Sequence, residues 1–331
     1  MLLKQLINTG IETISQLYPE REAREMVFVL LEHQIGTKRH THIVEPGYEV
    51  SDDDASAAIA AFGRMASGEP LQYVTGVADF YGRQFRVTPD VLIPRPETEI
   101  LCREALSYGT NRQMLQWPPP TSWAPPVPAA AGCSLQKPTG LFADRSRGWK
   151  DTADTFKILD LCTGSGCIAW TLALEMPGSE VTAVDISDGA LAVASSQDFS
   201  EEIDRTGAVS PVFVKADVLA GPSVSGLSGR YDILVSNPPY VMDKEKALMR
   251  PNVLDHEPHL ALFVSDEDPL LFYRAIAGWA LAVLKPDGYG IVEINEALGL
   301  RTADLFRAAG LRDVKVVKDL SDRDRFVYFR R

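Results

Sequence analysis

The sequence is poor in cysteine, in long hydrophobic runs and in positive charge, and each shortage excludes a class of protein. Four cysteines in 331 residues are too few for a disulfide framework, so they favour a reducing compartment. The longest apolar run, at 275–284, includes a glycine and is shorter than the roughly 18 residues of a membrane span. The N-terminus has neither a signal-peptide pattern nor the arginine enrichment of a transit peptide. We therefore expect a cytoplasmic protein with no membrane partner.

Basic residues are outnumbered by acidic ones. The chain carries 33 Lys and Arg against 45 Asp and Glu, a formal net charge of −12. Non-specific binding to a phosphate backbone depends on a surplus of Lys and Arg that releases counterions. The charge therefore disfavours a stable nucleic-acid partner and favours a protein or small-molecule substrate, although a local basic face is still possible.

The length predicts about two domains, and the N-terminal one reads as helical over residues 1–75. The stretch Arg21–His33 carries an apolar stripe at helical spacing and ends near Gly36, and Ser51 is a plausible N-cap ahead of three aspartates. Residues 76–99 form a predicted linker. Aromatic and β-branched residues, which begin just before this linker at Tyr73, predict a β-hairpin. Pro94 is placed to open the helix that follows.

Residues 100–331 have the rhythm of an α/β domain, after an interruption at about 110–152. That interruption is rich in Pro, contains three of the five Trp, and reads as an inserted surface loop whose aromatic residues suit docking. From residue 156, strand-like and helical patterns alternate, which predicts a mainly parallel sheet covered on both faces. The predicted strands are Lys157–Leu161, Val181–Asp185, Pro211–Val214, Tyr231–Val235, Tyr289–Ile294, Val314–Val317 and Phe326–Phe329. The predicted helices between them span 165–176, 187–198 and 268–284.

A glycine-rich turn follows the first of these strands. The segment 160–169, DLCTGSGCIA, satisfies the G-x-G-x-x-A pattern of dinucleotide sites, and Asp185 lies where a carboxylate can bind two ribose hydroxyls. These features leave a nicotinamide enzyme and an S-adenosylmethionine enzyme nearly tied. Asp160 favours the second, because its carboxylate would repel a pyrophosphate and attract the ammonium of a methionine moiety. Asp217, after the third strand, is placed to accept a hydrogen bond from an adenine amino group.

The fourth strand ends in VSNPPYV, residues 235–241, where Asn237 should lie beside the glycine-rich turn. An amide or exocyclic amine nitrogen is a poor nucleophile, so it must be held by its hydrogens and aimed at a methyl group. The Asn237 side-chain oxygen and the Pro238 carbonyl can each accept one N–H, and the double proline fixes both in advance. Tyr240 would supply an aromatic wall. The motif therefore predicts methylation of a planar nitrogen.

NPPY (237–240), DLCTGSG (160–166) and LIPRPETE (92–99) together resemble the glutamine N5-methyltransferases that modify the Gly-Gly-Gln motif of class I peptide release factors. GEPLQYVTG (68–76), DFYG (79–82) and EPHLAL (257–262) extend the resemblance over nearly the whole chain. NPPY alone also occurs in DNA adenine N6-methyltransferases, and the glycine-rich loop in ribosomal-protein glutamine methyltransferases. RPETE and the N-terminal helices favour the release-factor family.

The resemblance implies a class I, Rossmann-like methyltransferase fold with a seven-stranded, mainly parallel sheet, a helical substrate-recognition domain joined by a β-hairpin, and a monomer without a metal. It implies catalysis by Asn237, Pro238 and Tyr240. The implied S-adenosylmethionine contacts are Asp160, Cys162, Thr163, Gly164, Ser165, Gly166, Asp185, Asp217, Val218 and Asn237. The implied glutamine site is Asn237, Pro238, Pro239 and Tyr240. Cys162 departs from the family's usual glycine, and Val218 from the aromatic residue found in some members.

Other readings stay open from the residues alone. A nucleic-acid amino methyltransferase shares the NPPY chemistry, and a binding protein with a vestigial methyltransferase fold could use the helices and the Trp-rich insertion to hold a partner. Cys162 and Cys167 have no second cluster that would make a metal site, and Pro258 interrupts the pattern between His256 and His259. We therefore expect an active enzyme and no metal.

Overall fold

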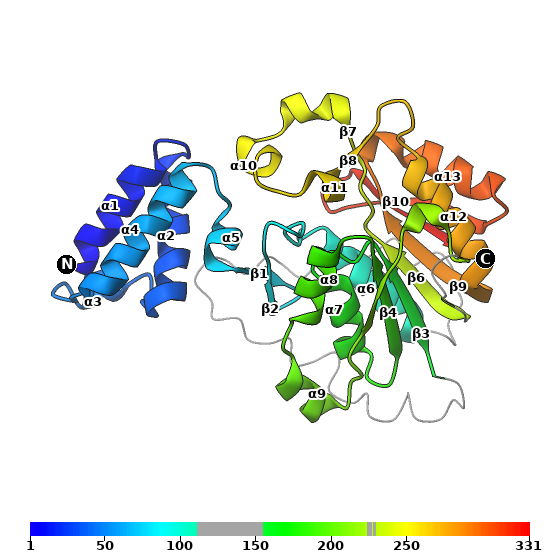
Figure 1. Ribbon diagram of the computed structural model, residues 1–331, viewed down its shortest axis with the longest axis horizontal. Coiled ribbons are helices and arrows are strands. Elements are labelled where there is room, and N and C mark those ends of the chain that lie inside the picture. Colours follow the sequence, from blue (N-terminus) through cyan, green and yellow to red (C-terminus); the bar gives the residue numbers. More distant parts are fainter. Residues whose placement is uncertain (111–154, 224–226, 228–229) are drawn as a thin grey trace.

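The computed structural model describes residues 1–110, 155–223, 227 and 230–331 (Figure 1). A group of helices at the N-terminus stands apart from a larger α/β unit, and a short hairpin lies between them in the chain. The predicted insertion at about 110–152 falls almost entirely outside the described residues. Its docking role therefore stays a prediction.

Residues 1–76 are all described and contain five helices. They are α1 (Leu3–Ile14), α2 (Glu20–Ile35), α3 (Thr41–Val44), α4 (Asp52–Ala66) and α5 (Leu71–Thr75). The predicted cap of α4 is confirmed, because the Ser51 hydroxyl accepts a 3.1 Å hydrogen bond from the Asp54 amide. Helix α2 ends at Gly36, whose φ of +70° is the left-handed conformation that glycine adopts without steric cost.

The N-terminal helices form their own hydrophobic core. Leu6, Val27 and Phe62 come from α1, α2 and α4 and are fully buried against one another. A Cβ at Gly10 would lie 2.6 Å from the Phe62 ring, so only glycine lets α1 approach α4 this closely. This core is separate from the cores of the α/β unit.

The hairpin consists of β1 (Val77–Phe80) and β2 (Arg83–Arg86), which pair antiparallel. The prediction of extended chain from Tyr73 is wrong at its start, because Pro70 precedes a turn of helix and Gly76 (φ +75°) ends it. The predicted helix start at Pro94 is also early. Residues 94–97 form an extended stretch and a turn, and α6 (Thr98–Thr110) begins after them.

Three charged and aromatic contacts fasten the hairpin to the α/β unit. Arg83 donates hydrogen bonds to Glu175 at 2.8 Å and to Glu202 at 2.7 Å. Phe85 is fully buried and meets the ring of Phe199 edge-on at 5.2 Å between centroids. The hairpin therefore belongs physically to the α/β unit, and the segment that follows it, 87–98, begins from this docked position.

The described residues form a seven-stranded sheet in the order β10-β11-β9-β6-β3-β4-β5. Only β11 runs antiparallel to its neighbours, so the sheet is mainly parallel, as predicted. The strands are β3 (Lys157–Leu161), β4 (Glu180–Asp185), β5 (Val212–Lys215), β6 (Tyr231–Ser236), β9 (Leu284–Glu293), β10 (Arg312–Lys318) and β11 (Asp324–Arg330). Strand order reverses between β3 and β6, which is where open α/β sheets bind ligands.

Helices cover both faces of this sheet. On one face α6 and α7 (Cys167–Glu175) pack in one hydrophobic core, and on the other α12 (Leu271–Val283) and α13 (Gly299–Ala308) pack in a second. Strand β6 lies between the cores and is buried along its whole length. The remaining helices of the sheet's first half are α8 (Asp188–Ser195) and α9 (Ser200–Thr206).

Short elements between β6 and α12 were not predicted. They are β7 (Val241–Met242), η2 (Asp243–Leu248), α10 (Pro251–Leu254), α11 (His259–Leu262) and β8 (Phe263–Val264), with η1 (Val218–Ala220) and η3 (Glu296–Leu298) elsewhere. In Figure 1 the elements between β6 and α12 form the yellow arch between the N-terminal helices and the sheet. Each is too short to show a periodic pattern in sequence.

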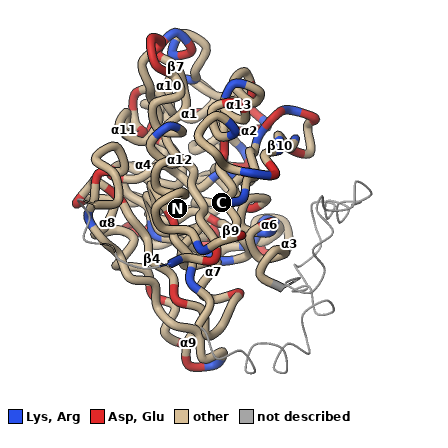
Figure 2. The backbone as a smooth tube through the Cα atoms, turned by 90° about the vertical axis from the view of Figure 1, so that its right-hand side faces the viewer, with Lys and Arg blue, Asp and Glu red and all other residues tan. Residues whose placement is uncertain are grey.

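Charge is spread along the chain, and Figure 2 shows basic and acidic positions interspersed over the tube. Among the described residues, no helix is both long enough and apolar enough to cross a membrane.

Candidate active site

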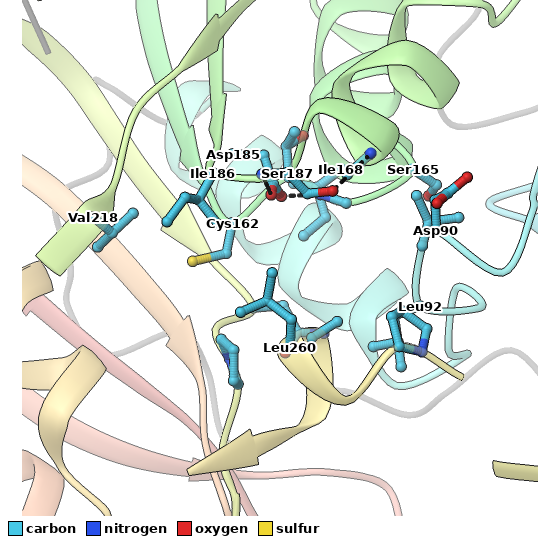
Figure 3. Close-up of a pocket in the computed structure, with 18 of the residues that line it drawn as sticks. Asp90, Leu92, Cys162, Ser165, Ile168, Asp185, Ile186, Ser187, Val218 and Leu260 are labelled. Carbon is cyan, nitrogen blue, oxygen red and sulfur yellow. Dashed lines mark hydrogen bonds between the residues drawn. The ribbon is translucent and has the colours of Figure 1, made fainter. Parts of the chain in front are cut away.

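A pocket of about 300 Å³ opens at the carboxyl ends of the first parallel strands. That volume lies at the lower end of the range for small-molecule sites. Its walls come from members of the segments 89–98, 162–168, 185–190 and 216–219, together with Asn237, Pro239, Pro258, Leu260, Ala261 and Phe272. Figure 3 shows Cys162, Val218 and Leu260 facing one space, with Asp90 and Leu92 across from the glycine-rich loop.

The glycine-rich loop turns sharply from β3 into α7. Cys162, Gly164 and Gly166 all have positive φ, at +63°, +54° and +80°. A Cβ at Gly166 would lie 3.0 Å from the Cβ of Ala194, so glycine permits the close packing of α7 against α8. Cys162 takes the left-handed conformation despite its side chain, at the position where the resembled family usually has glycine. Its thiol and residues 163–165 line the pocket.

Asp185 ends β4 and joins that strand to the loop. One carboxylate oxygen accepts a 2.9 Å hydrogen bond from the Gly164 amide, and the other accepts a 3.0 Å bond from the Ser187 amide. Burial raises the pKa of Asp185, and the amides of Ser187, Gly164 and Ile186 oppose that rise. An ionised carboxylate has about four acceptor positions. Asp185 therefore keeps acceptor capacity for ribose hydroxyls.

Asp160 lies behind the loop and is not part of the pocket wall. It is fully buried, and one of its oxygens accepts a 2.6 Å hydrogen bond from the Thr163 hydroxyl. Burial raises the pKa of Asp160 to about 7, the Thr163 hydroxyl and the Ala169 amide lower it, and the nearby Asp185 raises it. The predicted contact of Asp160 with the cofactor stays a prediction. In this structure the residue supports the loop from beneath.

Asp217 and Val218 follow β5, and both line the pocket as predicted from their place in the sequence. One Asp217 oxygen accepts a 2.8 Å hydrogen bond from the Leu219 amide, which caps η1 and fixes the carboxylate at the exposed rim. Val218 is buried, and its carbonyl accepts a 2.9 Å bond from the Trp279 indole. A planar base would meet an apolar surface and a carboxylate here.

The NPPY segment leaves β6 next to the glycine-rich loop, since β6 pairs with β3 as far as Ser236 and Leu161. Asn237 and Pro239 line the pocket, whereas Pro238 and Tyr240 do not. The Tyr240 hydroxyl donates a 3.0 Å hydrogen bond to Glu293. Tyr240 thus faces away from the pocket wall here, and the aromatic wall expected from it stays a prediction.

Sequence reasoning missed two groups of residues around this site. The first is the segment after the hairpin, where Arg95 and the Ile93 amide both donate to Glu257, at 2.5 Å and 3.2 Å. The second is Thr98 and Glu293, which connect Asn237 to the interior. Glu257 and Glu293 are buried carboxylates. A charged residue ending an apolar strand such as β9 was the one signal in the sequence for Glu293.

The donor set fits S-adenosylmethionine. A carboxylate ends β4 and another follows β5, an open loop with glycine at 164 follows β3, and the floor between them is apolar. A Cβ at Gly164 would meet nothing within 4 Å, so the loop leaves room for a ligand against its backbone. Among the described residues, no group of three or more His, Cys, Asp or Glu could hold a metal ion.

Together the fold and the pocket define a class I, S-adenosylmethionine-dependent methyltransferase. Comparison with known families agrees, because residues 150–256 match the model of the methyltransferase small domain. Residues 5–76 match the model of the PrmC N-terminal domain, which covers the helical N-terminal unit.

Curated relatives define the family more narrowly. A release factor glutamine methyltransferase of Bacteroides thetaiotaomicron is 39% identical over 264 residues, covering 80% of this chain and 77% of that protein. One of Flavobacterium psychrophilum is 31% identical over 329 residues, covering 99% and 98%. The chain belongs to the release factor glutamine methyltransferase family. A solved protein-(glutamine-N5) methyltransferase of Alicyclobacillus acidocaldarius is 27% identical, covers 75% of this chain and 99% of that one, and has a TM-score of 0.37.

Proposed function

We propose that this protein transfers a methyl group from S-adenosylmethionine to the side-chain amide nitrogen (N5) of the glutamine in the Gly-Gly-Gln motif of class I peptide release factors, which supports translation termination. The observation that carries the proposal is the placement of Asn237 on the wall of a cofactor-type pocket, directly beside the glycine-rich loop. The family relationship supports the same substrate, because relatives that match over most of their length carry that name.

The proposed catalytic step depends on orientation. The Asn237 side-chain oxygen and the Pro238 carbonyl would each accept one N–H of the substrate amide, so that the nitrogen lone pair points into the pocket. Pro238 and Pro239 are buried and rigid, which fixes the backbone of the segment, and with it the Pro238 carbonyl, before the substrate arrives. When the amide nitrogen takes the methyl group it must lose one proton, and a carbonyl acceptor or water can receive it.

Asp185 and Asp217 would hold the cofactor in place, the first through ribose hydroxyls and the second through the adenine amino group. S-adenosylmethionine, when bound, supplies a methyl group on a positively charged sulfur. The apolar walls near Val218 and Leu260 would keep water away from the reacting atoms, which strengthens the hydrogen bonds to the substrate amide.

We further propose that the helices of residues 1–75 recognise the release factor, that residues 76–99 link them to the catalytic domain at 100–331, and that the enzyme acts as a monomer in the cytoplasm. The helical unit has its own core, so it can serve as a rigid docking module. An ion pair joins this unit to the arch of residues 243–262: the Arg250 guanidinium lies 3.5 Å from the Glu22 carboxylate. A cytoplasmic site is where release factors meet ribosomes, and the charge of −12 disfavours nucleic acid as a stable partner.

Mass spectrometry of a candidate release factor tests the proposal. The protein is incubated with S-adenosylmethionine and the release factor, and the peptide that contains Gly-Gly-Gln is expected to gain the mass of one methyl group on the glutamine. A release factor with that glutamine replaced by alanine is the matched control and should stay unmodified.

Two parallel incubations cover the alternatives. One contains duplex DNA and the other a ribosomal protein fraction. Transfer of label to adenine amino groups or to a ribosomal protein, with the release factor unmodified, would contradict the proposal.

A further inference from the structure

The side chain of Asn237 can present either of two groups to the pocket. Its carboxamide has an oxygen that accepts hydrogen bonds and an NH₂ that donates them, and a half-turn exchanges the two. Only the orientation with the oxygen toward the pocket can accept an N–H from a substrate amide. Something outside the NPPY segment must therefore fix the orientation.

Asn237 is connected to two buried residues of other elements, directly to Thr98 and through Thr98 to Glu293. Thr98, the first residue of α6, receives a 3.2 Å hydrogen bond from the Asn237 NH₂ on its hydroxyl oxygen. The same hydroxyl donates a 2.8 Å hydrogen bond to Glu293, the last residue of β9. Thr98 is 2% exposed and Glu293 is 1% exposed. Thr98 lies 139 residues before Asn237 and 195 residues before Glu293 in the sequence.

The direction of these bonds follows from the chemistry of the carboxylate. An ionised carboxylate accepts hydrogen bonds and cannot donate them, so it takes the single proton of the Thr98 hydroxyl. The Thr98 oxygen then has only lone pairs left, and these can bind only the NH₂ end of Asn237. The Asn237 oxygen is left on the opposite side, toward the pocket. We propose that Thr98 and Glu293 are positioning residues that fix the Asn237 carboxamide with its oxygen toward the substrate nitrogen. This inference rests on the proposed function.

Several groups surround Glu293 and hold it in this role. Its second oxygen accepts a 3.0 Å hydrogen bond from the Tyr240 hydroxyl, so both ends of the NPPY segment are tied to one carboxylate. Arg325 acts on it as a positive charge and Glu97 as a negative one, and the hydroxyl of Tyr273 bonds to its backbone carbonyl. Burial raises the pKa of the Cys102 and Cys167 thiols, and the nearby negative charge of Glu293 raises it further.

Replacement of Thr98 tests the chain of hydrogen bonds. Thr98→Val keeps the shape and removes the hydroxyl, and Thr98→Ser keeps the hydroxyl and removes a methyl group. We expect Thr98→Val to lower kcat for methylation of the release factor by about tenfold or more, since misorientation of one reacting partner has effects of that size. Thr98→Ser should keep most of kcat, and calorimetry should show little change in the affinity of Thr98→Val for S-adenosylmethionine.

Thr302→Val is the matched control. Thr302 is also fully buried, on α13, and within the described residues its hydroxyl has no hydrogen-bond partner, so the same substitution removes no orienting bond. Its kcat should equal that of the unmodified protein. Equal kcat in Thr98→Val and Thr302→Val would overturn the proposal, as would an equal loss in Thr98→Val and Thr98→Ser.

Glu293→Gln gives a second, independent readout through pH. Protonated Glu293 can donate to Thr98, whose own proton is then free to bind the Asn237 oxygen and reverse the carboxamide. Burial raises the pKa of Glu293, while Thr98, Tyr240 and Arg325 lower it and Glu97 raises it. The kcat of the unmodified protein should therefore fall as the pH falls through this pKa, and Glu293→Gln, whose carboxamide does not titrate and whose oxygen can still accept the Thr98 hydroxyl, should lack that fall.

The outcomes separate the inference from the proposed function. Methylation of the release factor by the unmodified protein establishes the function, whatever the variants do. If that protein methylates and Glu293→Gln matches its kcat at every pH, the positioning role is wrong and the function stands. If the unmodified protein methylates only DNA, the same variants measured on DNA still decide whether Thr98 and Glu293 orient Asn237.

Discussion

The carboxylate of Asp185 accepts a 2.9 Å hydrogen bond from the backbone amide of Gly164, although 21 residues separate them. The bond ties the end of β4 to the loop that follows the neighbouring strand β3. The second oxygen of Asp185 binds the Ser187 amide at the start of α8. Two walls of the pocket are thus held in place by one side chain before any ligand binds, which lowers the ordering cost of binding.

Asp185→Ala should weaken the binding of S-adenosylmethionine by at least about tenfold. The variant loses the acceptor for ribose hydroxyls and leaves two backbone amides unpaired, and a hydrogen bond to a charged group contributes about 1.5–3 kcal/mol. Isothermal titration calorimetry measures the affinity. Asp188→Asn is the control, because that carboxylate lies on the next helix, is 80% exposed and pairs with Lys215. An Asp185→Ala variant with the affinity of the control would contradict the assignment of Asp185 to the cofactor site.

Asn237→Ala should remove most methylation while affecting cofactor binding less. The variant lacks the side-chain acceptor that orients the substrate nitrogen, and loss of one preorganised hydrogen-bonding group typically costs about a hundredfold in kcat. Single-turnover transfer of labelled methyl to the release factor measures the chemical step. Glu201→Ala, at an exposed position on α9, provides a truncation to alanine away from the pocket and from the proposed recognition helices. Near-normal transfer by Asn237→Ala would show that another group orients the nitrogen.

Local pattern predicted the elements of the sheet well. Strand Lys157–Leu161 has the predicted bounds, and the loop that follows it turns into α7 as its glycines indicate. Apolar runs flanked by turn residues are local signals, so one sequence suffices to find them. Tyr73 misled the prediction because its aromatic ring suits a strand. Its hydroxyl instead donates a 2.7 Å hydrogen bond to the buried Val91 carbonyl from a helical turn.

Three of the predicted site residues come together in the structure, each close after or at the end of a strand. Asp185 ends β4, Asp217 and Asn237 follow the ends of β5 and β6, and all three line one pocket. Thr98 and Glu293 could not be found in this way, because their contact with Asn237 depends on how α6 and β9 pack around β6. Such tertiary placement has no local signal in sequence.

Phe85→Ala should destabilise the protein by about 3–5 kcal/mol, the usual cost of removing a buried aromatic ring. Phe85 is fully buried between the hairpin and the α/β unit, where it meets Phe80 and Phe199 edge-on. Urea denaturation followed by circular dichroism gives the free energy of unfolding. Ile43→Ala, at a position that is 69% exposed, should change it by less than about 0.5 kcal/mol. Equal stability of the two variants would mean that the hairpin is not docked as described.

Asp160 should make the stability of the protein depend on pH between about pH 4 and about pH 7. Burial raises its pKa from the ordinary value of 3.8 to about 7 in the folded protein, so the folded state keeps a proton that the unfolded chain has lost. The folded state binds more protons than the unfolded state in this range. The contribution of Asp160 is therefore fully present below about pH 4 and is lost as the pH rises through about 7.

Asp160→Asn removes this titration and keeps an oxygen that can accept the Thr163 hydroxyl. The free energy of unfolding of the unmodified protein, relative to the variant, should fall by about 4 kcal/mol from about pH 4 to about pH 8, because each pKa unit corresponds to 1.36 kcal/mol. Urea denaturation of both proteins across this range measures the difference. Asp217→Asn, at the exposed rim of the same pocket, controls for the loss of one negative charge. A constant difference between the unmodified protein and Asp160→Asn would show that Asp160 is ionised throughout in the folded protein, with its charge compensated beneath the loop.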